Sequence, residues 1–121
     1  MWQVHRVLDA EVARLDGAAS RIVLLGQSQG SCCALDAALT YRTTIGGVFC
    51  SIGQLYAPTL AHATRSRADR CALRIITFNG AADRCIAASL ALRSYAELLD
   101  RGFYDMRSAP LTASPTQPWA A

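Results

Sequence analysis

The architecture of this chain follows from residues 21–31, which read Arg-Ile-Val-Leu-Leu-Gly-Gln-Ser-Gln-Gly-Ser. The first five of these residues form a short apolar run with β-branched side chains, typical of a strand buried on both faces of a parallel sheet. Residues 31–41 contain neither Gly nor Pro and are rich in Ala and Leu, so they favour a helix. The pentapeptide at 26–30 therefore joins a strand directly to a helix.

A Gly-x-Ser-x-Gly sequence at such a junction indicates a nucleophile elbow, a tight turn that exposes a serine at the carboxyl end of a strand. Gly26 and Gly30 are expected to leave room for neighbouring backbone, and Ser28 is the candidate nucleophile. The N–H of Gln29 is the candidate oxyanion donor, and one such donor contributes on the order of 3 kcal/mol to transition-state stabilisation. The alternative interpretation is a strand-to-helix turn with an inert serine.

The rest of the chain predicts alternating helices and strands. Helices are expected over residues 4–15 and 87–101, strands over 45–51 and 73–78, and a long connection with one short helix over 52–69. This order predicts an α/β fold, a parallel sheet of about three strands with flanking helices. Residues 1–106 would form this domain, and the Pro/Ser/Thr-rich segment 107–121 is expected to be a disordered tail.

Asp83 follows the third expected strand, at the same carboxyl edge of the sheet as Ser28. A catalytic serine needs a base, the base needs an orienting carboxylate, and in folds with this elbow the chain order is Ser, then Asp or Glu, then His. Asp83 fits the second place in that order. A helix N-cap or a solvated turn residue explains the same position equally well.

The histidines do not fit the third place. No histidine follows His62 in the sequence. His5 belongs to the first expected helix, which should pack away from the active edge. His62 lies in the connection after the second strand, so its use as a base would break the chain order. An ordinary loop histidine is the favoured interpretation, and the triad is expected to be incomplete.

Composition excludes several classes of protein. The chain has 121 residues, 52% of them apolar and 17% charged, which suffices for a folded core. No apolar run is long enough to span a bilayer and the first residues lack a signal-peptide pattern, so a soluble cytoplasmic protein is expected. The net charge of +3 comes with no aromatic interleaving and argues against nucleic acid. The five cysteines show no metal-ligand spacing, and the absence of lysine excludes a P-loop.

Three motifs occur in an order that resembles the phospholipase/carboxylesterase family of α/β-hydrolases, which includes the acyl-protein thioesterases. Residues 21–31 resemble that family's strand and GFSQGG elbow, and residues 45–51 resemble its next strand. Residues 75–83, Ile-Ile-Thr-Phe-Asn-Gly-Ala-Ala-Asp, resemble its strand ending in HGxxD. The likeness runs from about Val4 to Gly102.

This resemblance implies that Ser28 is the nucleophile, Asp83 the triad acid and Gln29 the source of one oxyanion N–H. The family hydrolyses carboxylic esters and thioesters without a metal or organic cofactor, so an acyl ester or thioester is the expected substrate. Any activity of this chain is expected to be weak. The alternative is a non-catalytic, degenerate hydrolase-like binding module or a truncated gene product.

The departures from the family pattern are specific. Asn79 stands where the family has a histidine, and Cys85-Ile86 replaces a proline-containing continuation. The family's first strands, with the loop that gives a second oxyanion donor, would precede Val4. Its catalytic histidine would follow Asp83 after one more helix and strand. Sheet edges left uncovered favour self-association.

Overall fold

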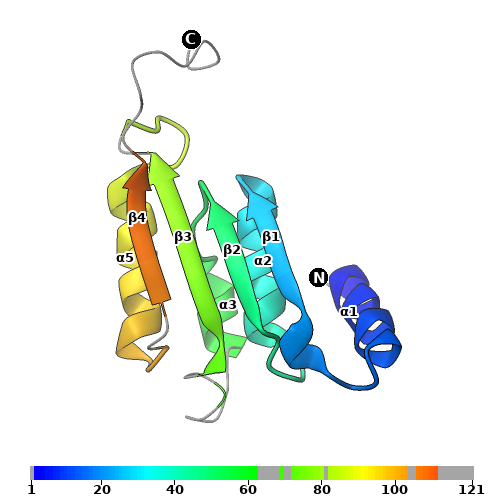
Figure 1. Cartoon of the computed structure of the whole chain (residues 1–121). Coiled ribbons are helices and arrows are strands. Elements are labelled where there is room, and N and C mark those ends of the chain that lie inside the picture. Colours follow the sequence, from blue (N-terminus) through cyan, green and yellow to red (C-terminus); the bar gives the residue numbers. More distant parts are fainter. Residues whose placement is uncertain (1, 63–68, 70–71, 81, 104–105, 112–121) are drawn as a thin grey trace.

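The structure is a computed structural model that describes residues 2–62, 69, 72–80, 82–103 and 106–111, with side chains described at all of these except 60–62 and 106–111. Its centre is one parallel sheet with the strand order β1-β2-β3-β4 (Figure 1). The strands are β1 (Val23–Gln27), β2 (Gly47–Ser51), β3 (Arg74–Gly80) and β4 (Met106–Leu111). Because all four run in the same direction, their carboxyl ends meet at one edge, at the top of Figure 1.

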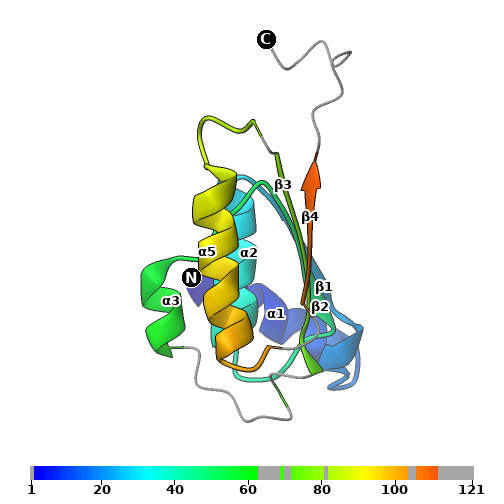
Figure 2. The same cartoon turned by 90° about the vertical axis from the view of Figure 1, so that its left-hand side faces the viewer.

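The helices lie on one side of this sheet, as Figure 2 shows. They are α1 (Trp2–Arg14), α2 (Gln29–Thr40), α3 (Ala57–His62) and α5 (Ala88–Asp100), with a 3₁₀ turn η1 (Ala19–Arg21) before β1. The α/β fold with a parallel sheet and flanking helices is confirmed, and so is the short helix within the connection over 52–69. Among the described residues, no helix has the length and apolar character needed to cross a membrane.

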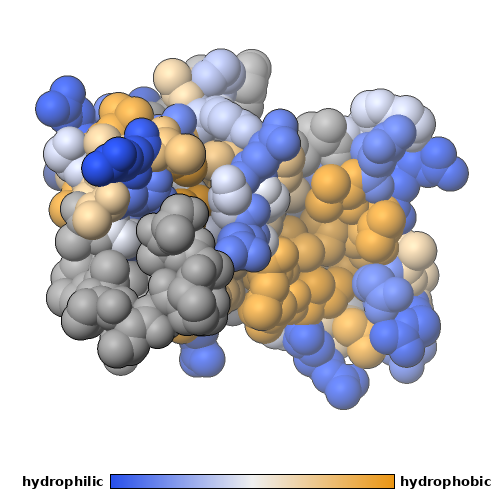
Figure 3. All heavy atoms as spheres, turned by 90° about the horizontal axis from the view of Figure 1, so that it is seen from above, coloured by the Kyte–Doolittle hydropathy of each residue, from blue (hydrophilic) through white to orange (hydrophobic). Residues whose placement is uncertain are grey.

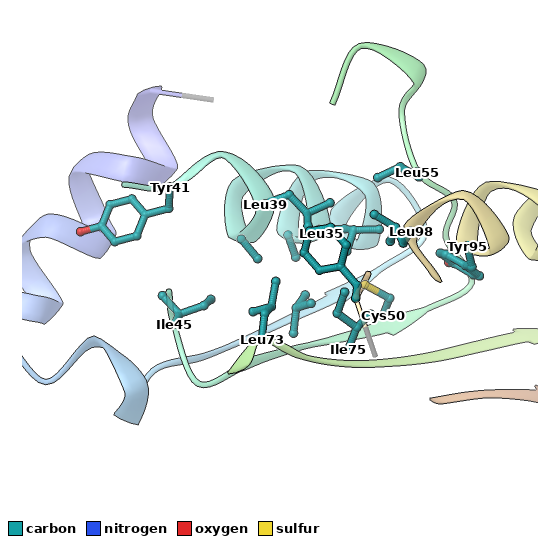
Figure 4. Packing of buried hydrophobic residues seen from close by; sticks show 14 of the residues in the cluster. Leu35, Leu39, Tyr41, Ile45, Cys50, Leu55, Leu73, Ile75, Tyr95 and Leu98 are labelled. Atoms are coloured by element: carbon teal, nitrogen blue, oxygen red, sulfur yellow. The ribbon is translucent and has the colours of Figure 1, made fainter. Parts of the chain in front are cut away.

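The core lies between the sheet and the two long helices that cover it (Figure 4). Leu35 and Leu39 of α2 and Leu98 of α5 project toward Ile75 of β3, and all four side chains are fully buried. Burial of one such aliphatic side chain contributes about 1.5–3 kcal/mol to folding. The periodic apolar residues of the expected helices therefore fix which face of α2 and α5 meets the sheet.

The expectation that the ordered domain ends at residue 106 was wrong for residues 107–111. These residues form β4 and pair in parallel with β3, from Ile75 opposite Met106 to Gly80 opposite Leu111. The low apolar content of the segment suggested a tail, but ladder hydrogen bonds use backbone groups and do not require apolar side chains. Pro110 is tolerated because an edge strand does not need every N–H for the ladder. Residues 112–121 of the expected tail lie outside the described residues.

Polar contacts fix α1 against the far end of α2. The Tyr41 hydroxyl donates to Oδ1 of Asp9 at 2.7 Å, and Arg42 Nη2 donates to the same oxygen at 2.6 Å. The hydrogen bond from Tyr41, followed by that from Arg42, lowers the pKa of Asp9 below its usual 3.8. His5 Nε2 lies 3.2 Å from the Thr40 hydroxyl. These contacts lie at the C-terminal end of α2, opposite the carboxyl edge of the sheet.

Candidate active site

Ser28 has a backbone conformation that side chains rarely adopt. Its φ and ψ are 53° and −124°, between the end of β1 and the start of α2. Strain of this kind costs on the order of 1–3 kcal/mol and persists only where the surroundings enforce it. The N–H of Ser28 donates to the Ser51 carbonyl at 2.8 Å, and its carbonyl accepts from the N–H of Ser31 at 2.9 Å. The turn is therefore held between the end of β2 and the first turn of α2.

The Ser28 side chain is not used to cap the helix. Serine at an N-cap position normally accepts a hydrogen bond from the helix's first N–H groups. Ser28 occupies the N-cap position of α2, yet its side chain makes no capping hydrogen bond. The residue is exposed at the carboxyl edge, onto which Figure 3 looks from above. Helix capping therefore does not explain why a serine stands here.

The two elbow glycines have different roles. A Cβ on Gly26 would lie 2.2 Å from the carbonyl oxygen of Gly30 and 2.5 Å from the backbone nitrogen of Ser31, so only glycine fits there. A Cβ on Gly30 would meet nothing within 4 Å. The expectation that both glycines leave room for backbone was therefore correct for Gly26 and wrong for Gly30. Gly30 contributes the backbone that approaches Gly26, and this does not require the absence of a side chain.

Ser31 stabilises the elbow from its buried side, a role that the sequence did not predict. Its hydroxyl oxygen lies 2.6 Å from the Gly26 carbonyl and 2.8 Å from the Ser51 carbonyl, and it shares its proton between these two acceptors. The side chain is only 1% exposed. A Cβ on Gly53 would lie 2.4 Å from Ser31 Cβ, so the loop after β2 also packs directly against it. The one sequence feature that could have indicated this role is the position of a serine on the apolar face of a predicted helix.

Gln29 is the first residue of α2 and is exposed. The first N–H groups of a helix have no partner within it, and the helix dipole favours negative charge at this end. The backbone at Gln29 thus has the position that an oxyanion donor requires next to a nucleophile at residue 28. Its assignment as that donor stays a prediction.

Asp83 lies in the turn that follows β3, and its carboxylate has local partners. Oδ1 accepts hydrogen bonds from the N–H of Cys85 at 2.7 Å and of Ile86 at 2.9 Å. The N–H of Asp83 itself donates to the Gly80 carbonyl at 3.2 Å. The N-cap of α5 is Ala87, so Asp83 does not cap that helix. The contacts are those of the turn residue that sequence analysis considered as an alternative, and they also fix the direction of the carboxylate.

Ser28 and Asp83 share the carboxyl edge of the sheet without being neighbours. Ser28 follows β1 and Asp83 follows β3, with β2 between them. Neighbouring strands lie about 4.8 Å apart, which separates the two positions by roughly 10 Å along the edge. In a serine triad a histidine bridges the nucleophile and the acid, so these two residues are not expected to touch.

The loop after β2 fills the edge between them. Ile52 has a φ of 56°, a second strained conformation, and its N–H donates to the Phe78 carbonyl at 2.6 Å. Asn79 is 3% exposed and donates from Nδ2 to the Gly53 carbonyl at 2.9 Å. The Tyr95 hydroxyl donates to the same carbonyl at 2.7 Å. Asn79, at the position where the resembling family has a histidine, therefore holds this loop against β3.

Neither histidine is placed at the edge as a base. His5 lies against Thr40 and Tyr41 at the opposite end of α2, as the sequence predicted. His62 is the last residue of α3, which runs from the loop after β2 toward the start of β3, away from the carboxyl edge (Figure 1). Its side chain lies outside the described residues. The sequence after β4, where the resembling family has its histidine, is Thr-Ala-Ser-Pro-Thr-Gln-Pro-Trp-Ala-Ala.

Among the described cysteines, those of α2 and β2 are buried or partly buried, whereas Cys85 is exposed in the turn that contains Asp83. Cys50 is fully buried, and burial raises its pKa to about 12, so its thiol stays protonated at neutral pH. Cys32 is also buried, and Cys33 is partly so. In the part of the chain that the structure describes, no three His, Cys, Asp or Glu side chains come together as metal ligands.

Solved structures share this fold at low sequence identity. The chain is similar to esterase PE8, with a TM-score of 0.73 and 20% identity over 92% of this chain and 49% of that chain. It is similar to Zea mays acyl-protein thioesterase 2, with a TM-score of 0.69 and 17% identity over 95% of this chain and 60% of that one. A variant of Arabidopsis thaliana SOBER1 gives a TM-score of 0.69 and 21% identity over 90% and 52% of the two chains.

The chain thus spans about half to three-fifths of the length of these solved proteins. The partial α/β-hydrolase fold that the sequence predicted is confirmed by this likeness. A comparison with curated proteins finds no match. The model of the phospholipase/carboxylesterase family matches residues 1–111, from α1 to the end of β4. The chain belongs to the phospholipase/carboxylesterase family.

Proposed function

We propose that Ser28 is the nucleophile of a serine carboxylesterase or acyl-protein thioesterase site. The observation that carries this proposal is the serine itself: it is strained, exposed and free of any capping hydrogen bond at the start of α2. Backbone strain of this kind clusters at functional positions. The family supports hydrolysis of an ester or thioester as the reaction class.

In the proposed reaction Ser28 Oγ attacks the acyl carbonyl carbon, and the carbonyl oxygen becomes an oxyanion. The N–H of Gln29 donates to that oxyanion at the positive end of α2. Collapse of the tetrahedral species expels the alcohol or thiol and leaves an acyl-serine. Water then attacks the acyl-serine, releases the carboxylic acid and restores the Ser28 hydroxyl.

Proton transfer limits this sequence of steps. The attacking hydroxyl must lose a proton and the leaving group must gain one, which a triad histidine does in related chemistry. No histidine stands between residues 63 and 121. Hydrolysis by the chain as given would therefore be slow, at the level that oxyanion stabilisation and binding alone supply.

Asp83 is the proposed acid of the site. The two N–H groups that hold Oδ1 fix the carboxylate at the carboxyl edge, so it needs no reorganisation to orient a base. The assignment requires a histidine that bridges Ser28 and this carboxylate. The same hydrogen bonds would exist if Asp83 served the turn alone.

A non-catalytic module that binds an acyl group or a partner protein is the second candidate. It is favoured by Asn79, which stands where the resembling family has a histidine and whose Nδ2 donates to the Gly53 carbonyl, while its buried Oδ1 has no hydrogen-bond partner among the described residues. Binding without turnover would need the shape of the edge but not its proton transfers. Cytoplasmic location and the lack of nucleic-acid binding also stay predictions.

The test is hydrolysis of a short p-nitrophenyl ester by the purified chain beside the Ser28→Ala variant. Ser20→Ala is the matched control, because Ser20 is an exposed serine in η1, before the start of β1. The proposal expects slow release of p-nitrophenol that is lost in Ser28→Ala and kept in Ser20→Ala. Equal rates for all three proteins would contradict a nucleophilic role for Ser28 and favour the binding module.

A further inference from the structure

The Gly53 carbonyl, in the loop after β2, accepts hydrogen bonds from two buried side chains. The Tyr95 hydroxyl of α5 donates to it at 2.7 Å, and Asn79 Nδ2 of β3 donates at 2.9 Å. Tyr95 is 2% exposed, and burial raises the pKa of its phenol, so the hydroxyl keeps its proton at neutral pH. A carbonyl oxygen has two lone pairs, so these two donors use its full capacity. The helix α5 and the strand β3 therefore hold the loop at one atom.

The same loop contacts the elbow at two places. Two residues before Gly53, the Ser51 carbonyl accepts the N–H of Ser28 at 2.8 Å. Gly53 itself packs on Ser31, because a Cβ on Gly53 would lie 2.4 Å from Ser31 Cβ and 3.3 Å from Ser31 Oγ. The Ser31 hydroxyl in turn lies 2.8 Å from the Ser51 carbonyl. This loop thus links the Tyr95 hydroxyl to the backbone of Ser28.

The residue between these contacts, Ile52, is strained. Its φ of 56° is rare for a β-branched residue, and such a conformation persists only where the surroundings enforce it. The N–H of Ile52 belongs to the same planar peptide unit as the Ser51 carbonyl, so any rotation of that unit moves both groups together. This N–H donates to the Phe78 carbonyl at 2.6 Å. If the loop relaxed at Gly53, release of the strain would turn the Ser51 carbonyl away from Ser28.

We propose that Tyr95 is a positioning residue for Ser28 and acts through the loop after β2. The inference rests on the proposed function, in which Ser28 is the nucleophile. By fixing the Gly53 carbonyl, the Tyr95 hydroxyl keeps the Ser51 carbonyl on the N–H of Ser28 and so fixes where Ser28 Oγ begins its attack. Misplacement of a reacting group by about 1 Å can slow a reaction about 100-fold. Tyr95 is buried and does not meet an acyl substrate, so the rate of the chemical step depends on it and substrate binding does not.

A second buried tyrosine provides a matched control. Tyr41 is 4% exposed, and its hydroxyl donates to Oδ1 of Asp9 at 2.7 Å, the same distance as in the bond from Tyr95 to Gly53. Figure 4 shows the two tyrosines at opposite ends of the core cluster. Replacement of either by phenylalanine removes one buried, hydrogen-bonded hydroxyl and keeps the ring. The two variants therefore lose the same kind of interaction, and only one of them loses it beside the loop that contacts Ser28.

The test is p-nitrophenyl acetate hydrolysis by the wild-type chain, Tyr95→Phe and Tyr41→Phe, with imidazole supplied as the base at a fixed concentration. The rate with Ser28→Ala is subtracted from each, so that only Ser28-dependent hydrolysis remains. Tyr95→Phe is expected to lower kcat about tenfold at unchanged KM, and Tyr41→Phe to keep kcat within about twofold of the wild type. Urea denaturation of the same samples checks that both variants are folded.

Several results would overturn the inference and leave the proposed function standing. One is Ser28-dependent hydrolysis that Tyr95→Phe leaves unchanged. Another is an equal loss of kcat in both tyrosine variants, which would assign the effect to stability. A third is a higher KM at constant kcat, which would assign Tyr95 to substrate binding.

A wild-type chain without Ser28-dependent hydrolysis contradicts the proposed function itself, and the inference falls with it. Asn79→Ala keeps the test valid if Tyr95→Phe does not fold, because it removes the other donor to the Gly53 carbonyl. It is expected to lower kcat at unchanged KM, and an unchanged kcat would overturn the inference.

Discussion

The turn after β1 and the turn after β3 end at the same edge of the sheet but depend on different kinds of interaction. The first is held by the backbone: Gly26 packs against Gly30, and Ser31 bonds two strand carbonyls. The second depends mainly on a side chain, the Asp83 carboxylate, with one backbone hydrogen bond from Asp83 to Gly80. An elbow built from close backbone packing keeps its shape whether or not catalysis follows. A catalytic acid or base depends on a single side chain, whose replacement need not unfold the protein.

The largest effect is expected from Gly26→Ala, which tests whether backbone packing holds the elbow. The new methyl group would stand 2.2 Å from a backbone oxygen that cannot move aside. Overpacking against backbone should lower the free energy of unfolding by about 2–4 kcal/mol. Gly30→Ala is the control, because its methyl group meets nothing within 4 Å. It should change stability by at most about 1 kcal/mol, toward greater stability, since alanine favours a helix. Equal losses in urea denaturation would contradict this account of the elbow.

Ser31→Ala should have the next largest effect on stability. It removes a hydroxyl that is 1% exposed and leaves the Gly26 and Ser51 carbonyls without that donor. The expected loss is about 1–3 kcal/mol in the same denaturation experiment. Ser28→Ala removes an exposed hydroxyl only one turn away and should change stability by less than about 0.5 kcal/mol. A larger loss in Ser28→Ala than in Ser31→Ala would reverse the roles given to these two serines.

The same residues show how much of the fold and of the site could be predicted from the sequence. Gly26 and Ser28 were recognised because a strand, a tight turn and a helix leave a periodic signal in one short stretch. Ser31 and Asn79 were not recognised as supports, because their partners are carbonyls brought near by pairing of β1, β2 and β3. β4 was missed because its ladder with β3 depends on backbone groups that every residue has. Local sequence patterns predict individual helices and strands. Contacts between segments that are distant in the sequence become apparent only once the sheet has formed.

Asp83 allows the second turn to be tested on its own. If its carboxylate only closes the turn, Asp83→Asn should keep the hydrogen bonds from Cys85 and Ile86, since asparagine also accepts through a side-chain oxygen. Asp83→Ala should lose about 1 kcal/mol of unfolding free energy. Hydrolysis of a p-nitrophenyl ester, measured beside stability, separates the two roles. With imidazole added as the base, a catalytic acid predicts that Asp83→Asn retains stability but loses Ser28-dependent hydrolysis, and unchanged hydrolysis would leave Asp83 as a turn residue.

The smallest effect is expected at α1, far from both turns. The pKa of Asp9 is lowered by the hydrogen bond from Tyr41 and then by Arg42, so its ionised form favours the folded state. Its stabilising contribution is therefore present above pH 3.8 and is lost as the pH falls through the lower pKa of the folded chain. Asp9→Asn should make the urea midpoint less dependent on pH between about pH 5 and pH 2. A variant with the same pH profile as the wild type would contradict this role.

The central claim is that Ser28 is a working nucleophile and that residues 63–121 supply no histidine as its base. Added imidazole tests it most directly, because this small base is the functional group of histidine. The measurement is p-nitrophenyl acetate hydrolysis against imidazole concentration for the wild-type chain, with Ser28→Ala to subtract the reaction of imidazole in solution. The account predicts that the difference between the two proteins grows with imidazole. A difference that stays at zero at every concentration would contradict it and show that the turn keeps only the shape of a nucleophile elbow.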